Sequence, residues 1–343
     1  MQEGTEGTYG LRTAALGPVE TLAQSVSAMA PSTSASLTIP LVFALAGNAT
    51  WFVYLLATGA TLLVGFCVSR FARLSASPGS LYSYTAETLP PFFGVTAAWA
   101  LLLAYIGTGA SVAGGALYYA NLFSQQFFHS APPAVLTLTV VCGMAGLIAY
   151  RDVKLSAELM LWIEVFSVGF ILIVLAVLVF RFGFQFDLDQ FRLKGVSVSA
   201  LGPALVLSMF SFVGFEAATT LGGEARDPLK TIPRAVLQCA ILAGVFFMVC
   251  SYSEVLGFRG QTSQLGDSTS PLHLLATKAG VSLLGVAIDF GAAVACSPAC
   301  LLARPRLRAC LCGWHIADCC QPRLSAPTIV IKRREPQWHC PRY

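Results

Sequence analysis

Charged side chains are scarce in this chain of 343 residues. Asp, Glu, Lys and Arg make up 11% of it, whereas soluble domains carry about 25%. None of the four occurs between residues 21 and 69, or between residues 88 and 150. A spanning helix needs about 20 apolar residues, so each of these stretches is long enough for two spans. The scarcity of charge, with a mean hydropathy of +0.70, excludes a soluble domain and predicts an integral membrane protein.

Enzyme and nucleotide-binding motifs are also missing. The chain has no Walker loop, no dinucleotide-binding fingerprint and no HExxH pair. With four histidines in all, there is little from which to build a Ser-His-Asp triad. The net charge of +4 comes from loop residues, so no nucleic-acid partner is expected. Seven of the eleven cysteines crowd into residues 296–343, but their spacing does not fit paired CxxC ligands, and a zinc cluster is the less favoured interpretation. We expect neither an enzyme nor a bound metal or cofactor.

The apolar segments predict helices, because ten-residue stretches of alternating polarity, which mark membrane β-strands, are absent. Spans are expected near 21–43, 48–69, 92–122, 131–150, 155–181, 200–222 and 235–257, with a weaker eighth near 281–303. Loop lysines and arginines gather on one side of this arrangement. The positive-inside rule then places the N-terminus in the cytoplasm.

The first span is interrupted at residues 30–36, which read Ala-Pro-Ser-Thr-Ser-Ala-Ser. Pro31 removes a backbone donor and disfavours helical geometry at Ala30. Unwound backbone here would present N–H groups at the start of a half-helix, where an anion such as a carboxylate can bind. A proline-kinked helix, with serine hydroxyls bonded back to the backbone, is an equally favoured alternative.

The sixth span is interrupted in a similar way by Ser211, Gly214 and the carboxylate of Glu216. Freed carbonyl groups at this point could hold an ammonium group, with Phe210, Phe212 and Phe215 as apolar walls. For any one of these phenylalanines, ordinary core or lipid-facing packing is the favoured interpretation. For Glu216 itself, a structural role bonded to a neighbouring helix or to unwound backbone is favoured over direct substrate contact. Two interrupted segments in two halves of a chain indicate the binding site of a transporter.

Two further acids lie in apolar segments: Glu164 in the fifth span and Asp289 in the weaker eighth. Acids at membrane depth commonly take part in proton or ion pathways, so both are candidates for ion coupling. Glu164 has an alternative, a solvated position near the cytoplasmic end of its span.

Three motifs in order resemble the amino acid–polyamine–organocation (APC) permeases. Gly214-Phe215-Glu216 followed by Ile232-Pro233-Arg234-Ala235 is similar to their sixth-span signature. Ser77–Tyr84 resembles their PxGGxYxY segment before span three, and Val153–Ala157 resembles the start of span five. The resemblance implies the leucine-transporter-like fold of two inverted five-helix repeats, usually with twelve spans, of which about eight are expected here.

The resemblance also implies a function and a site. The function is alternating-access transport of an amino acid or related amine, coupled to H⁺, to Na⁺ or to exchange. The substrate carboxylate would lie on the first span and its amine on carbonyls of spans one and six. By motif position the binding residues are Ala30, Pro31, Ser32, Thr33, Ser34, Ala35, Ser211, Phe212, Val213, Gly214, Phe215 and Glu216. The span-one break lacks the usual glycines, which leaves the substrate open.

The segment boundaries complete these expectations. Residues 1–20 are expected to be cytoplasmic, 21–181 to form the first repeat, and 200–303 to form spans six to eight of a partial second repeat. Residues 304–343 alternate cysteine, proline and arginine without helical periodicity. This tail is expected to be aberrant, through a frameshift after about residue 293, or else a divergent cytoplasmic tail. The expected location is the plasma membrane, in particular a bacterial inner membrane. The rival hypothesis is a non-transporting permease fragment or a membrane interaction protein.

Overall fold

A computed structural model describes residues 16–75, 80–129, 132–140, 143, 153–182, 187–193, 196–222, 225–258, 265, 270–293 and 296. Within these ranges the chain is helical apart from its connections, and extended pairing is limited to one parallel bridge between Leu16 and Ala225. Four stretches are long and apolar enough to cross a membrane: Pro18–Ala72, Pro91–Gln125, Trp162–Arg181 and Pro228–Gly257. The prediction of an all-α membrane protein is confirmed.

The first predicted span is two helical segments joined by a sharp bend. Helix α1 covers Pro18–Met29 and ends at Ala30, which has left-handed backbone angles of φ 47° and ψ 64°. From Pro31 the chain is helical again through α2 (Pro31–Thr33), the π-helical turn η1 (Ser34–Thr38) and α3 (Ile39–Ala46). The left-handed residue followed by proline stops the i to i−4 hydrogen-bond ladder at this point.

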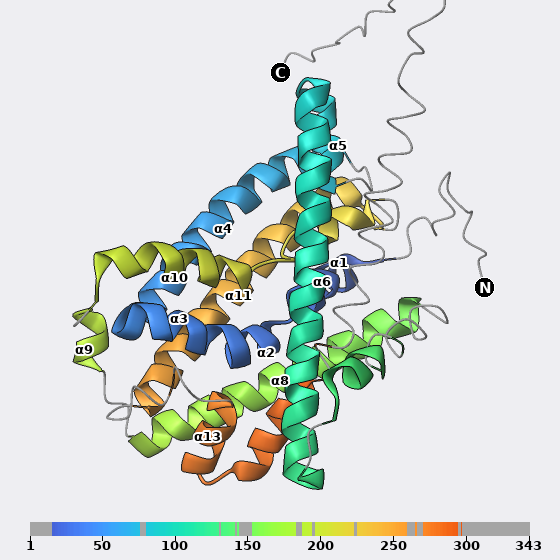
Figure 1. Cartoon of the computed structure of the whole chain (residues 1–343). Coiled ribbons are helices and arrows are strands. Elements are labelled where there is room, and N and C mark those ends of the chain that lie inside the picture. Colours follow the sequence, from blue (N-terminus) through green and yellow to red (C-terminus); the bar gives the residue numbers. More distant parts are fainter. Residues whose placement is uncertain are drawn as a thin grey trace, which may run out of the picture.

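The next helices lead away from this bend. A 3₁₀ turn, η2 (Gly47–Ala49), precedes α4 (Thr50–Ala72), and α5 (Ser80–Thr88) precedes α6 (Pro91–Phe128). The 38 residues of α6 make it about 57 Å long at 1.5 Å per residue. That exceeds a hydrocarbon core of about 30 Å. Figure 1 shows α6 upright, with other helices on both sides of it in this view.

Helix α5 precedes the third span, and its tyrosines Tyr82 and Tyr84 are both buried. The Tyr84 ring stacks on Phe71 of α4, with 5.9 Å between ring centroids. Tyr84 also belongs to a buried apolar cluster with Val68 and Ala72 of α4, so contact with α4 covers its ring.

The second half of the described chain begins with α8 (Val153–Phe182) and the short α9 (Leu188–Phe191). Helix α10 (Val198–Phe210) ends in a turn over residues 211–216, followed by the 3₁₀ helix η3 (Ala217–Leu221). Helix α11 spans Pro228–Gly257, and α13 spans Pro271–Lys278. A further apolar helix covers Ser282–Ala293.

The predicted spans match these elements, with shifted ends. Span seven begins seven residues earlier than predicted, at Pro228 instead of 235. Pro228 fits the first helical position, and the helix also accommodates Pro233 in its interior. The predicted span at 131–150 is described over 132–140 and at 143, where residues 134–140 are helical. The tail at 304–343 lies outside the described residues.

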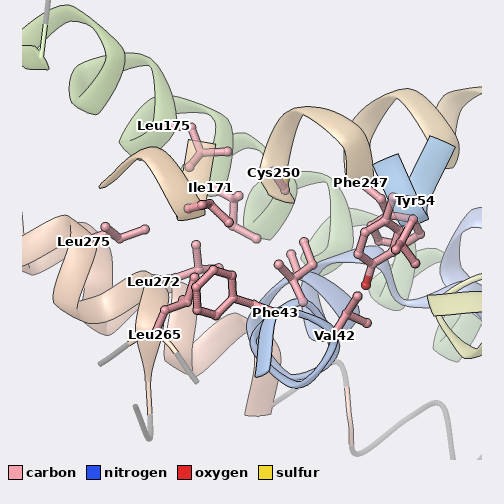
Figure 2. Packing of buried hydrophobic residues seen from close by; sticks show 14 of the residues in the cluster. Val42, Phe43, Tyr54, Ile171, Leu175, Phe247, Cys250, Leu265, Leu272 and Leu275 are labelled. Carbon is pink, nitrogen blue, oxygen red and sulfur yellow. The ribbon is translucent and has the colours of Figure 1, made fainter. Parts of the chain in front are cut away.

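Helices α4 and α11 pack side by side (Figure 1). A Cβ atom added to Gly244 of α11 would overlap Thr58 of α4, so a small residue permits this close approach. The main cluster of buried apolar side chains joins α3, α4, α8, α11 and α13. Figure 2 shows part of it, with Phe247 beside Tyr54 and Leu272 near Leu265. This packing fixes the helices on which the two breaks depend.

Candidate functional site

The two interrupted spans lie against each other. The backbone N–H of Ala218, in η3, donates a hydrogen bond to the hydroxyl oxygen of Ser25 in α1 at 2.9 Å. Both residues are fully buried. The part of α1 that precedes the first break therefore contacts the segment that follows the second break. Residues 193 positions apart in sequence are brought into direct contact.

Gly214 of the second break lies close to the last turn of α1. Its φ of +107° is a conformation that side-chain-bearing residues rarely adopt. A Cβ atom added to Gly214 would lie 2.7 Å from the carbonyl oxygen of Ala28, which is shorter than real contacts of this kind. Glycine is therefore required here both by backbone conformation and by space.

The first break exposes few backbone donors. Pro31 has no N–H, and the N–H groups of Thr33 and Ser34 both donate to the carbonyl oxygen of Ala30, at 3.1 and 3.2 Å. The hydroxyl of Ser36 donates to the carbonyl oxygen of Ser32 at 3.0 Å, as expected for a serine that satisfies freed backbone. The π-helical turn that begins at Ser34 is a type of irregularity frequent at functional sites.

The remaining donor at this break, the N–H of Ser32, is bound by a carboxylate of the protein. Glu164 of α8 accepts the Ser32 N–H at its Oε1 atom, 2.6 Å away, and the Ser32 hydroxyl at its Oε2 atom, 3.0 Å away. Glu164 is 2% exposed. The alternative of a solvated Glu164 is therefore wrong, because helix packing encloses the side chain against the first break.

The second break is a tightened turn and not an extended segment. The N–H groups of Ser211, Phe212 and Val213 each donate to the carbonyl three residues earlier. The Gly214 N–H departs from this pattern and donates to Oε2 of Glu216 at 3.2 Å. Glu216 thus bonds to backbone of its own turn, which is the structural role favoured from the sequence.

The side chains of the second break that were predicted to bind substrate differ from one another in their surroundings. The Ser211 hydroxyl lies 3.1 Å from the hydroxyl of Tyr54 in α4. The ring of Phe212 is buried and packs edge-on against Phe247 of α11, with 5.2 Å between centroids. Val213 and Phe215 are half-buried. Phe212 is therefore part of the core and not an exposed wall.

Residues of the eighth predicted span also approach the first break. The Thr33 hydroxyl lies 3.7 Å from the sulfur of Cys296. On the same segment, the carboxylate of Asp289 lies 2.9 Å from Nδ1 of His273 in α13, and Asp289 is 2% exposed. Asp289 is thus a buried acid with a histidine partner, whereas the other coupling candidate, Glu164, is bound by a neutral serine.

One buried acid was not singled out from the sequence. Glu254, in α11, is fully buried, and the described part of the chain offers no hydrogen-bond partner to either of its carboxyl oxygens. It lies within electrostatic range of Tyr54, whose hydroxyl contacts Ser211. The rule that selected Glu164, an acid inside an apolar span, could have found Glu254 as well.

Together, two interrupted helices in contact within a bundle of apolar helices define the class of transporters with discontinuous spans. The chain belongs to the amino acid permease family, whose sequence model matches residues 16–301. This family lies within the APC superfamily, whose members are transporters with a leucine-transporter-like fold.

The curated relatives agree with this assignment. An uncharacterised transporter of Mycobacterium tuberculosis is 32% identical over 257 residues, covering 70% of this chain and 54% of the relative. The low-affinity putrescine importer PlaP of Escherichia coli is 25% identical over 211 residues, or 60% and 46% of the two chains. The branched-chain amino acid permease BcaP of Bacillus subtilis is 23% identical over 267 residues, or 72% and 55%. The chain spans about half the length of these relatives.

Proposed function

We propose that this chain binds an amino acid or related amine between its two broken helices, as part of a secondary transporter that works by alternating access. The contact between the breaks carries this proposal. Ser25 binds the Ala218 N–H, and Gly214 lies against Ala28, so the two interruptions lie next to each other. Broken helices meeting at membrane depth form the substrate sites of many secondary transporters.

The named relatives support the range of substrates. One imports putrescine and another is a permease for branched-chain amino acids. Both ligands carry an ammonium group at neutral pH. Carbonyl oxygens at the ends of α1 and α10 would accept from that ammonium group, with coupling through H⁺, Na⁺ or exchange. The proposed location is the plasma membrane, with the N-terminus in the cytoplasm.

Uptake into proteoliposomes tests this function. The purified 343-residue chain would be reconstituted, and entry of labelled leucine and labelled putrescine would be measured against protein-free vesicles. We expect saturable uptake of at least one of them, inhibited by the same unlabelled ligand. The Gly214→Val variant, in which a branched side chain would meet Ala28, should abolish it. Absence of saturable uptake by the intact chain would favour the rival hypothesis of a non-transporting fragment.

A matched control separates the site from general effects of substitution. Gly59 lies in α4, and a Cβ atom added there would meet nothing within 4 Å. Gly59→Val should therefore retain uptake. Equal loss in both glycine variants would show that the breaks have no special part in transport.

A further inference from the structure

Glu164 occupies the place where the first break would hold an anion. Its two carboxyl oxygens accept the N–H and the hydroxyl of Ser32 at 2.6 and 3.0 Å. Ser32 is fully buried and follows Pro31 directly, at the start of a continuous helical run from Pro31 to Ala46. An arrangement of one backbone N–H and one hydroxyl on a carboxylate is what a substrate carboxylate would make at this position.

The other backbone N–H groups of the break cannot replace the N–H of Ser32. Pro31 lacks an N–H, and the N–H groups of Thr33 and Ser34 are directed to the Ala30 carbonyl. A substrate carboxylate would therefore have to displace Glu164 or lie beside it. Two carboxylates in contact repel each other, and the repulsion is stronger away from water.

In its ionised form Glu164 favours a different ligand. Both of its hydrogen bonds go to Ser32, which is neutral, and no lysine or arginine of the described residues forms an ion pair with it. The nearby groups at the break, Thr33 and Cys296, are also uncharged side chains in this contact. A carboxylate at membrane depth is costly without a partner, and a ligand ammonium group would compensate it.

We infer that Glu164 is an internal replacement for the substrate carboxylate, and that the site selects aliphatic amines that lack a carboxylate. The inference rests on the proposed function and narrows its substrate class. Glu164 supplies the negative charge that an amino acid would bring with it. The ligand then needs an ammonium group that pairs with Glu164 at the first break. The other end of the ligand is either apolar or a second amino group.

Pairs of ligands that differ by one carboxylate test this selectivity. Isothermal titration of the purified chain would compare isopentylamine with leucine, and putrescine with ornithine. We expect the amine of each pair to bind more tightly by about tenfold or more, the effect of one charge-assisted contact. An amino acid that binds as tightly as its amine would overturn the inference and leave the proposed function standing. Binding of no member of either pair would contradict the proposed function itself.

Two substitutions assign the selectivity to Glu164. Glu164→Gln keeps an oxygen for the Ser32 N–H but removes the charge, so amine affinity should fall by about tenfold. Glu164→Ala frees both Ser32 donors, so leucine should gain relative to isopentylamine. Glu87→Gln, at an exposed acid of α5, is the matched control and should leave the preference unchanged. An unchanged preference in folded Glu164→Gln protein would overturn the assignment; folding is checked by size-exclusion chromatography.

Discussion

Gly214 of the second break lies directly against the carbonyl of Ala28 in the last turn of α1, with 2.7 Å between that oxygen and the position of an added Cβ atom. The central glycine of the family signature therefore has a packing role between two helices as well as a conformational one. Its φ of +107° would strain any other residue.

Gly214→Ala should destabilise the chain by about 1–3 kcal/mol, the typical cost of a strained backbone conformation. The expected result is a lower midpoint of thermal unfolding in detergent, followed by fluorescence-detected size exclusion. Gly59→Ala is the control. It lies in a helix interior with open space around it, where alanine should gain about 0.5–1 kcal/mol. A Gly214→Ala protein as stable as wild type would contradict the close approach.

Ser25→Ala should remove the acceptor of the Ala218 N–H and leave a buried donor unpaired, at a cost of about 1–3 kcal/mol. Ser27→Ala, on the same helix, removes only a hydroxyl that donates to the Ala23 carbonyl within α1. Its effect on the unfolding midpoint should be clearly smaller. Equal effects of the two substitutions would argue against a specific contact between the breaks.

Replacement of the two buried glutamates should change stability in opposite directions. Glu254→Met removes a buried carboxyl group that has no hydrogen-bond partner among the described residues, so the unfolding midpoint should rise. Glu164→Met leaves the N–H and hydroxyl of Ser32 without their acceptor, so the midpoint should fall.

The same pair of variants also separates stability from function. An acid kept at membrane depth against its cost usually has a functional role, so uptake by Glu254→Met should fall despite the gain in stability. A Glu254→Met protein with a lower midpoint would show that this carboxyl group makes a favourable contact.

Tyr84 provides a test that depends on pH. Burial, with a smaller contribution from the negative charge of Glu87, raises the pKa of Tyr84 from 10.0 to about 12. The unfolded chain therefore loses this proton first, and wild-type stability should fall as pH rises from about 10 towards 12. Tyr84→Phe removes this effect and keeps the stacking on Phe71.

The measurement is a difference, because other tyrosines and lysines ionise in the same range. The unfolding midpoint of Tyr84→Phe relative to wild type should be higher at about pH 11 than at about pH 9. A difference that stays constant with pH would show that the hydroxyl of Tyr84 is not enclosed in the native state.

Sequence reasoning predicted the two breaks because the local chemistry of proline, glycine and serine sets them. Pro31 and Gly214 act on their own backbone, and their effects need no knowledge of distant residues. The start of α11 was less predictable, because Pro228 fits the first helical position, where its missing N–H would be unpaired anyway.

The partners across the breaks could not be predicted. Ser32 and Glu164 are 132 residues apart, and their contact depends on how α8 is rotated about its axis against the first span. The sequence shows that Glu164 is an acid in an apolar helix but not which group it faces. For the same reason the sequence did not show which side chain Phe212 would meet, and tertiary packing places it in the core beside Phe247.

The bridge between Leu16 and Ala225 is a third contact between these segments, after the Ser25–Ala218 hydrogen bond and the packing of Gly214 on Ala28. The Arg226 N–H donates to the Leu16 carbonyl at 2.9 Å, just before α1 begins and just before α11 begins. Ser25 with Ala218, and Ala28 with Gly214, follow at successive levels along α1. These two hydrogen bonds and one close contact would have to break before α1 could move along the segment that follows the second break. We therefore expect α1 and residues 214–222 to move together in any rearrangement of this protein, because a relative movement would break both hydrogen bonds.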